Sequence, residues 1–128
     1  MPFDPSTTKP EIDFPEGEAP TELVVEDIAV GDGAEVTPGS PIQAHYVGVA
    51  HSTGEEFDAS WNRGAPLAFT AGIGQVIKGW DDGLLGMKEG GRRKITIPPH
   101  LGYGDRGAGA AIKGGETLIF VVDLVQVG

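Results

Sequence analysis

The sequence predicts an α+β fold in which an antiparallel five-stranded sheet curls around one short helix. Three observations support this: five short β-rich segments separated by turn residues, a single helix-like segment, and no regular strand–helix–strand alternation. Strands without that alternation favour an antiparallel arrangement over a parallel doubly wound sheet. The 128 residues contain no internal repeat, and they are enough for one domain but too few for two ordinary ones.

Apolar alternation and β-branched residues mark the five predicted strands. The segment 117–127, TLIFVVDLVQV, is the clearest, because alternate apolar residues share one face. The segment 92–99 alternates Ile95 and Ile97 with polar neighbours, which is typical of a half-buried strand. The remaining strands are predicted at 21–28, 41–50 and 67–72, the last two beside Pro or Gly turn signals.

The single predicted helix spans roughly residues 75–85 and ends near Gly86. The apolar residues that gather on one side of its helical wheel are Val76, Ile77, Trp80 and Leu84. The common interpretation of such a stripe is a helix packed on the core, and the glycines between these residues permit close approach to a sheet. A second interpretation is a pocket with an apolar floor and a rim of exposed N–H groups from the first helical turn. The pattern alone leaves both open.

Residues 1–22 differ in composition from the rest and predict an N-terminal arm, which leaves 23–128 as the folded domain. The arm holds five of the ten prolines and six acidic residues against one lysine. Such a segment buries too little apolar surface to offset the entropy lost on ordering it. We therefore expect an extended or disordered arm; the alternative is that Phe3 or Phe14 docks on the domain.

Composition and charge exclude several classes of function. The formal net charge of −10 argues against a nucleic-acid partner, because a phosphate backbone calls for a basic face. The chain has no cysteine, which excludes disulfides, thiolate catalysis and cysteine-ligated metal sites. No apolar run reaches the length of a membrane span, and the N-terminus lacks the pattern of a secretory signal. We expect a cytoplasmic protein with no membrane partner.

Sequence motifs that often indicate a cofactor site or a catalytic group lack the flanking residues or spacing that such sites need. GYGDRG at 102–107 formally matches the dinucleotide fingerprint, but Pro98 and Pro99 precede it and no helix follows directly. The three histidines show no metal-ligand spacing, and Ser60 lacks the elbow context of a hydrolase nucleophile. We therefore predict no metal and no cofactor. What remains is a long glycine-rich loop between two strands, and loops of that length are usually functional or disordered.

The segment GEEFDASWNRGAPL at 54–67 is more distinctive. Arg63 follows Asp58 by five residues, and one interpretation pairs the two within an otherwise apolar cavity. The alternative is an ordinary surface ion pair, which contributes little. Spacing alone does not decide between them.

Four segments together resemble the FKBP-type peptidyl-prolyl cis–trans isomerases, the macrolide-binding family. They are HYVG (45–48), GEEFDAS (54–60), VIKGWDDGLLGMKEGGRRKITIPPHLGYG (76–104) and LIFVVDLV (118–125). The resemblance runs in order through residues 23–128 and is to the short single-domain bacterial type. It implies an antiparallel sheet curled around one helix, with the ligand pocket between them.

The resemblance also implies a set of site residues. Those implied for catalysis are Tyr46, Phe57, Asp58, Trp80, Tyr103 and Phe120. Those implied for binding of substrate or ligand are Arg63, Leu67, Val76, Ile77 and Ile112. The Ile77 N–H and the Tyr103 hydroxyl would donate to carbonyl groups of the bound molecule. Asp58 would be a polar wall residue held by Arg63 and the Tyr46 hydroxyl.

The sequence departs from the family pattern at the pocket rim. Leu67 stands where many members have phenylalanine, and Ala108 and Ala111 replace a histidine and an isoleucine, whereas Ile112 is retained. Residues 113–115, KGG, replace a proline-rich stretch. The resemblance therefore implies a smaller and more flexible rim, with looser contacts to a macrolide.

The function implied is isomerisation of X–Pro bonds in polypeptides, which assists slow folding steps. Trp80 would supply a flat apolar floor for the proline ring. The expected partners are proline-containing polypeptides and the macrolides rapamycin and tacrolimus, and the expected state is a monomer. The alternative is a proline-binding chaperone or partner-binding module that uses the same pocket with little turnover.

Overall fold

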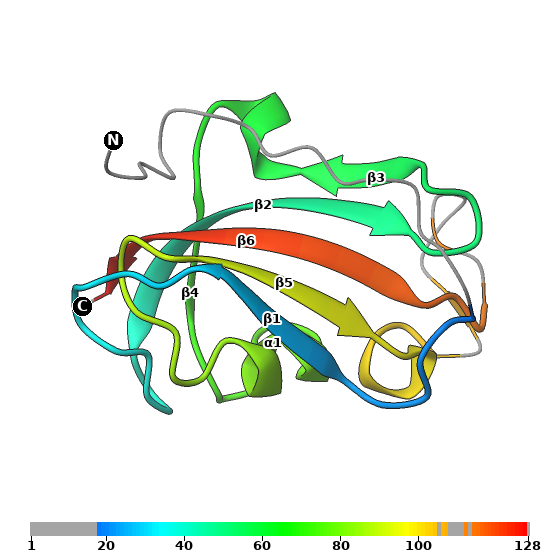
Figure 1. The fold of residues 1–128 in the computed structure, drawn as a ribbon, viewed down its shortest axis with the longest axis horizontal. Helices are drawn as coiled ribbons and strands as arrows, with labels where there is room; N and C mark the ends of the chain where they lie inside the picture. The colour runs from blue at the N-terminus through cyan, green and yellow to red at the C-terminus, as the bar shows by residue number, and fades with distance from the viewer. Residues whose placement is uncertain (1–17, 105, 108–111, 113, 128) are drawn as a thin grey trace.

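The computed structural model describes residues 18–104, 106–107, 112 and 114–127 (Figure 1). In chain order its elements are β1 (Val24–Ala29), β2 (Pro41–Ala50), β3 (Glu56–Ala59), the 3-10 helix η1 (Ser60–Arg63), β4 (Leu67–Thr70), α1 (Lys78–Gly83), β5 (Arg92–Ile97), the 3-10 helix η2 (Pro99–Leu101) and β6 (Leu118–Val127). Most of the predicted N-terminal arm, residues 1–17, lies outside the described residues, so the prediction of disorder for it stays a prediction.

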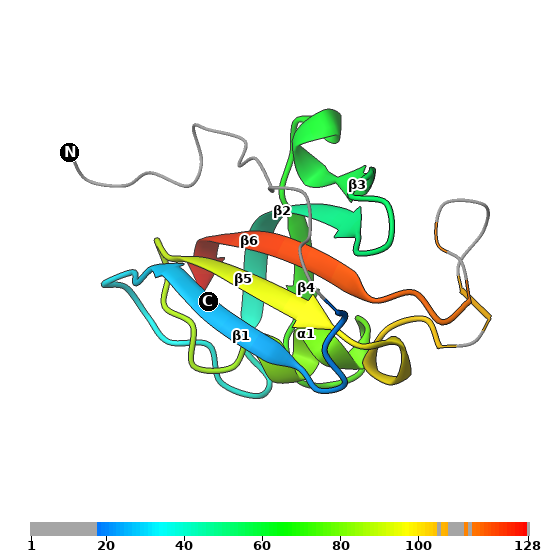
Figure 2. The same ribbon diagram turned by 45° about the vertical axis from the view of Figure 1, so that its right-hand side comes forward.

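The described strands form one antiparallel sheet in the order β1-β5-β6-β2-β3. β2 organises the sheet, because it pairs with β6 along one edge and with two short strands along the other. The first half of β2 pairs with β4, from Pro41 to Ala44, and the second half pairs with β3, from Val47 to Val49. The sheet curls, and α1 lies against its concave side, which we call the inner face (Figures 1 and 2).

The predicted α+β architecture is confirmed, with one strand more than expected. The sequence predicted five strands, whereas the sheet has six. The additional strand is β3, whose four residues fall within the GEEFDAS segment. Its residues, EFDA, hold one large apolar side chain between two acids, so they do not stand out as a β-rich run in the sequence. The pairing with β2 therefore decides that Phe57 and Asp58 belong to a strand.

The helix is shorter than its apolar stripe. The stripe predicted residues 75–85, but α1 has six residues, and Ile77 just before it has an extended backbone (φ −58°, ψ 151°). The Asp81 carboxylate accepts hydrogen bonds from the N–H groups of Gly72 (2.9 Å) and Gly74 (2.8 Å), which ties the preceding turn to the helix. Within the described part of the chain, no helix is long and apolar enough to cross a membrane.

Arg93 of β5 fixes the other end of α1. Its Nη1 donates to the carbonyl oxygen of Gly83 (2.9 Å), a terminal group that the helix leaves without an intrahelical partner, and to that of Leu85 (3.1 Å) just beyond the helix. Its Nε donates to Asp27 of β1 at 2.7 Å. A single cation thus connects the end of α1 to two strands.

The hydrophobic core lies between α1 and the inner face of the sheet. Its fully buried members include Leu84 after the helix and Ile95 and Ile97 of β5. A Cβ on Gly79 would lie 2.6 Å from Ile97, and one on Gly83 would lie 3.1 Å from Ile95. The glycines of the helix are therefore the residues that let it approach the sheet.

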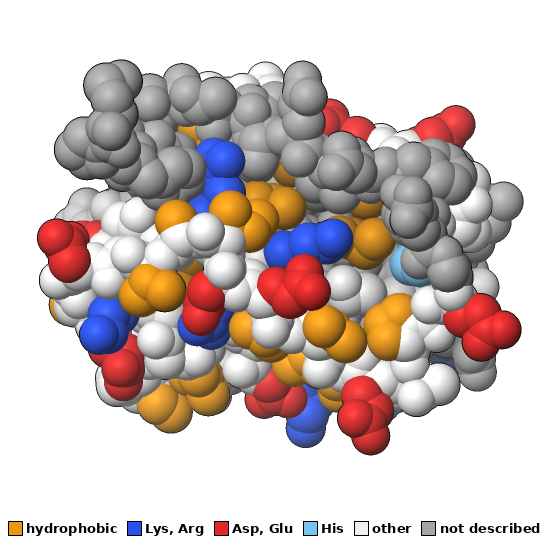
Figure 3. All heavy atoms as spheres, viewed as in Figure 1, with side chains coloured by type: hydrophobic (Ala, Val, Ile, Leu, Met, Phe, Trp, Pro, Cys, Tyr) orange, Lys and Arg blue, Asp and Glu red, His pale blue; other side chains and the backbone are white. Residues whose placement is uncertain are grey.

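Charged side chains are interspersed with hydrophobic ones on the face seen in Figure 3, where acidic and basic groups alternate. The described residues form no broad single-sign basic patch on the visible part of that face. Such a mixed surface suits solubility more than binding of a polyanion.

Candidate active site

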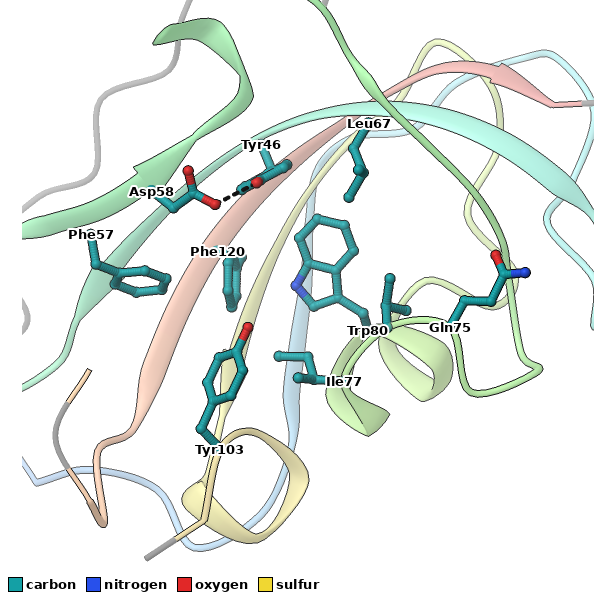
Figure 4. A pocket seen from close by; sticks show the side chains of 10 residues that line it. Tyr46, Phe57, Asp58, Leu67, Gln75, Ile77, Trp80, Tyr103 and Phe120 are labelled. Atoms are coloured by element: carbon teal, nitrogen blue, oxygen red, sulfur yellow. Dashed lines mark hydrogen bonds between the residues drawn. The ribbon is translucent and has the colours of Figure 1, made fainter. Parts of the chain in front are cut away.

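A cavity of about 330 Å³ opens between the sheet and α1. The residues that line it are Tyr46, Phe57, Asp58, Leu67, Gln75, Val76, Ile77, Trp80, Tyr103 and Phe120. They come from the inner faces of β2, β3, β4 and β6, from α1 and the turn before it, and from the segment after η2 (Figure 4). The short helix and the extended backbone at Ile77 therefore leave an opening that a longer helix would fill.

Trp80 forms the floor of this cavity. Its side chain is 3% exposed, and its ring meets Tyr46 (centroids 5.0 Å apart, 83°) and Phe120 (5.2 Å, 90°) edge to face. Phe69 of β4 lies 5.6 Å from the same indole. Edge-to-face contacts of this kind favour one ring orientation. The carbon atoms of the indole ring give the floor its apolar surface, and the indole Nε1 is buried without a hydrogen-bond partner in the described structure.

Phe57 forms one wall and depends on a glycine behind it. Its ring lies 5.4 Å from Phe120 at 90°. A Cβ on Gly48 of β2 would approach Phe57 to 2.6 Å and Phe120 to 2.7 Å. Gly48 was not among the predicted site residues, although a glycine inside a strand is a sign of close approach by another group.

A polar network lies beside this wall, where β2, β3 and η1 meet. The Tyr46 hydroxyl donates to Asp58 Oδ2 at 2.5 Å, as drawn in Figure 4. Arg63 of η1 donates through Nη1 to Asp58 Oδ1 (2.9 Å) and through Nη2 to the Tyr46 hydroxyl (2.8 Å). The side chains of Arg63 and Asp58 are 50% and 43% exposed. The predicted Asp58–Arg63 pair therefore exists, at the rim of the cavity rather than deep within it.

The pKa values of three ionisable groups in the cavity wall are shifted further from neutral pH. Burial raises the pKa of Asp58, but the hydrogen bonds from Tyr46 and Arg63 outweigh it, so the pKa lies below its usual value. Burial, followed by the hydrogen bond to Asp58, raises the pKa of Tyr46. Burial and the charge of Asp58 raise the pKa of Tyr103. At neutral pH the carboxyl is thus ionised, both tyrosines are protonated, and none of these three groups exchanges a proton readily.

A second network on the other side of β2 anchors η1. The Ser60 hydroxyl accepts a hydrogen bond from the Tyr46 N–H (2.7 Å) and lies 2.8 Å from His45 Nδ1. The His45 ring stacks on Trp61, with centroids 4.2 Å apart. Ser60 is 0% exposed, so its hydroxyl is closed to a substrate despite the neighbouring histidine. This anchor, which the sequence did not predict, places Arg63 beside Tyr46.

The structure brings most of the predicted site residues together and places two elsewhere. Arg63 supports the polar wall from outside the lining, and Ile112 is 6% exposed within the hydrophobic core. Gln75 lines the cavity without having been predicted, and its Oε1 accepts the Thr70 N–H at 2.8 Å. The rim departures at Ala108, Ala111 and Lys113 lie outside the described residues.

No group of three or more histidine, aspartate or glutamate side chains that could hold a metal ion occurs in the described ranges. An apolar floor, a carboxylate locked in hydrogen bonds and a tyrosine hydroxyl directed into the cavity suit the binding of an uncharged, partly apolar group (Figure 4). They do not suit nucleophilic attack, which needs an activated nucleophile beside a base.

Comparison with known proteins assigns the family. The family model of FKBP-type peptidyl-prolyl cis–trans isomerases matches residues 33–125. The chain belongs to this family. It is 63% identical over 123 residues to an FK506-binding protein of Streptomyces anulatus, an alignment that covers 95% of this chain and 99% of that protein. It is 50% identical over 118 residues to a probable FK506-binding protein of Corynebacterium glutamicum, which covers 92% and 98% of the two chains.

Solved structures lead to the same conclusion. The crystal structure of AtFKBP13 superimposes with a TM-score of 0.78 and 42% sequence identity, over 86% of this chain and 96% of that one. The family resemblance in the sequence is thereby confirmed, and so is the activity it implied: the protein is an FKBP-type peptidyl-prolyl cis–trans isomerase.

Proposed function

We propose that this FKBP-type isomerase twists X–Pro bonds by desolvation in the Trp80 cavity, without proton transfer. The observation that carries the proposal is an apolar floor surrounded by groups whose pKa values lie away from neutrality. The barrier to rotation is about 18–20 kcal/mol, because rotation breaks amide resonance. The twisted amide loses its charge-separated character, so an apolar cavity favours it relative to the planar ground state. This is differential binding of the transition state.

Each polar group then has a modest part. Tyr103 donates its hydroxyl to the carbonyl of the rotating amide, and the Ile77 N–H, beside the start of α1, donates to a neighbouring carbonyl. Asp58 keeps the wall polar at one side, with its charge balanced by Arg63. A neutral hydrogen bond contributes about 0.5–1.5 kcal/mol, so none of these groups is indispensable.

The proposal extends to macrolide binding. Two relatives are named FK506-binding proteins, and the cavity of about 330 Å³ suits the proline-like pipecolyl ring of tacrolimus and rapamycin. Leu67 offers less contact area than the phenylalanine of many family members. We expect both macrolides to inhibit, with lower affinity than for members with a fuller rim. The absence of binding at micromolar ligand would contradict the cavity assignment.

A protease-coupled assay on a proline tetrapeptide tests the function directly. Turnover that tacrolimus abolishes supports the isomerase, and Phe57→Ala serves as the cavity-opening variant. Tacrolimus binding with negligible turnover would favour the alternative, a proline-binding module. Acceleration of a refolding reaction limited by proline isomerisation, in the same buffers, would extend the activity to protein folding.

A monomeric state and a cytoplasmic location remain proposals. The net charge of −10 supports the first, because self-repulsion opposes association. Sedimentation velocity checks the oligomeric state, and cell fractionation checks the location.

A further inference from the structure

Another cavity, which we call the second cavity, lies beside the Trp80 cavity at the side of α1 that faces solvent. Its volume is about 350 Å³. Its apolar lining includes Pro38, Val76 and Leu85, and its charged lining is Lys78, Asp81 and Asp82. Val76 also lines the Trp80 cavity, so the two cavities adjoin at one side chain.

The turn before α1 forms one side of the second cavity. Gly72 (φ +79°) and Gly74 (φ +81°) lie in this turn, and the Asp81 carboxylate accepts both of their N–H groups. A Cβ on Gly74 would meet no other atom within 4 Å, so the space beside the turn is open. Asp81 thus holds the turn in place, which leaves Asp82 as the acid of the second cavity that can receive a ligand.

The lining of the second cavity has an excess of negative charge. Lys78 and Asp82 are exposed and lie four residues apart on α1, and neither is in an ion pair among the described residues. With Asp81, two carboxylates stand against one ammonium group, a net charge of −1. A lysine or arginine side chain lays its aliphatic stem on apolar surface and keeps its charged head in water. Such a side chain matches both the apolar and the acidic part of this lining.

The direction of a bound polypeptide leads from the Trp80 cavity to the second cavity. In the binding mode proposed above, Tyr103 holds the carbonyl of the rotating amide, which precedes the proline, and the Ile77 N–H holds the next carbonyl, that of the proline. Tyr103 lies to one side of Trp80 and Gln75 to the other in the view of Figure 4. The chain therefore advances from Tyr103 past Ile77 toward residues 74–76, which border the second cavity.

On the basis of this binding mode, we propose that the substrate segment after the proline continues over Val76 into the second cavity, where Asp82 selects a lysine or arginine side chain. One to three extended residues span roughly 3–11 Å, which is enough to pass one side chain. The net charge of −10 on the whole chain assists, because it attracts basic segments. The isomerase thus prefers X–Pro bonds that are followed by a basic residue.

Peptides that differ in one side chain test this preference. Each carries a leucine–proline bond, with lysine or norleucine placed in turn at the first three positions after the proline. Norleucine keeps the aliphatic stem and lacks the charge. Exchange between the cis and trans NMR signals gives kcat/KM, and at one of these positions lysine should exceed norleucine by about threefold, the scale of an exposed ion pair. Lysine placed before the proline is the control and should give no such gain.

Two variants should change the lysine-to-norleucine ratio of kcat/KM in opposite directions. Asp82→Asn should bring the ratio close to one, and Lys78→Gln should raise it further, by about twofold. Glu26→Gln makes the same change of net charge at an exposed position that lines neither cavity, and it should leave the ratio as in wild type. A ratio that neither Asp82→Asn nor Lys78→Gln changes, or that Glu26→Gln changes equally, would overturn the proposal.

Binding gives a second readout that does not depend on turnover. Titration with the lysine peptide should shift the methyl resonances of both Val76 and Leu85, whereas a peptide that ends at the proline should shift those of Val76 alone. Unchanged Leu85 signals with the longer peptide would contradict occupancy of the second cavity. Turnover of the norleucine peptides by the wild-type protein tests the isomerase function separately: turnover with equal ratios would overturn only this preference, and no turnover would overturn the proposed function as well.

Discussion

Two polar networks begin at adjacent residues of β2, and they differ in their exposure to solvent. Tyr46 points into the cavity and joins Asp58 and Arg63, whose side chains remain about half exposed. His45 points to the outer face, where its neighbour across the strands, Asp123, is 0% exposed and bound to Arg92. The cavity network is open to a ligand and contributes little to stability, whereas the outer network is closed and holds the fold.

Depth of burial explains the difference. An exposed ion pair is worth at most about 1 kcal/mol, whereas removing one partner of a buried pair costs about 3–5 kcal/mol. Ser60 connects the two networks, because its hydroxyl contacts both His45 and the Tyr46 N–H. The buried network therefore supports the geometry of the exposed one.

The largest expected effect is on stability at the outer network. Asp123→Asn removes the charge that faces Arg92 (2.5 Å and 3.0 Å) in a fully buried position. We expect it to lower the free energy of unfolding by about 3 kcal/mol, because the largely buried Arg92 loses this counter-charge; the charge of Asp123 itself contributes little, since burial raises its pKa. Asp58→Asn is the matched change in the cavity network and should cost less than about 1 kcal/mol. Urea denaturation of both variants checks this, and equal losses would remove the distinction between the networks.

The next effect is on catalysis at the apolar wall. Phe57→Ala opens the cavity to water and removes contact area worth about 2 kcal/mol, so kcat/KM should fall roughly 30-fold. Trp80→Leu should be milder, because an apolar floor survives. The protease-coupled assay measures both, with circular dichroism as the check on folding. A folded Phe57→Ala variant with wild-type kcat/KM would be incompatible with catalysis by desolvation.

A smaller effect is expected at the hydroxyl directed into the cavity. Tyr103→Phe keeps the ring and removes one neutral hydrogen-bond donor, so kcat/KM should fall by about threefold to tenfold. The free energy of unfolding should hardly change, because the Tyr103 side chain is 40% exposed. Complete loss of activity in the folded variant would mean that this hydroxyl does chemistry rather than binding.

The smallest predicted effect is the pH dependence of stability that His45 of the outer network causes. Burial lowers the pKa of His45, and the charge of Asp123 only partly offsets this. The unfolded chain therefore binds the proton more readily than the folded one. The stability due to neutral His45 is present above about pH 6.5 and is lost as pH falls below that value. Urea denaturation of His45→Gln should show a weaker loss of stability between about pH 7.5 and 5.5 than wild type does; an identical loss would show that His45 is not responsible.

Much of the fold could be predicted from the sequence, because alternating apolar residues and flanking turn residues mark most of the strands. β2, β5 and β6 were predicted near their observed bounds. β3 was missed, because its residues, EFDA, hold two acids and one large apolar side chain and so lack the β-rich composition of the other strands. The helix was predicted too long, because the apolar stripe continues into Val76 and Ile77, which line the cavity from outside the helix.

The sequence predicted the site residues whose chemical type indicates a role. It predicted less well the residues whose role depends on where the fold places them. Gln75 left no signal, since a polar residue before a helix is ordinary. Arg63 was placed correctly beside Asp58 but lies outside the cavity lining. The burial of β6 on both faces did have a signal: LIFVV, its first five residues, is apolar on both faces, which is typical of a strand covered on both sides.

The central claim is that the cavity works by desolvation and not by proton transfer. The most direct test is the wild-type kcat/KM measured between about pH 6 and 8, in water and in heavy water. Because Asp58 is ionised and Tyr46 and Tyr103 are protonated across this range, the account predicts a flat profile and the same rate in both solvents. A bell-shaped profile, or a clearly slower reaction in heavy water, would contradict it and require a general acid or base.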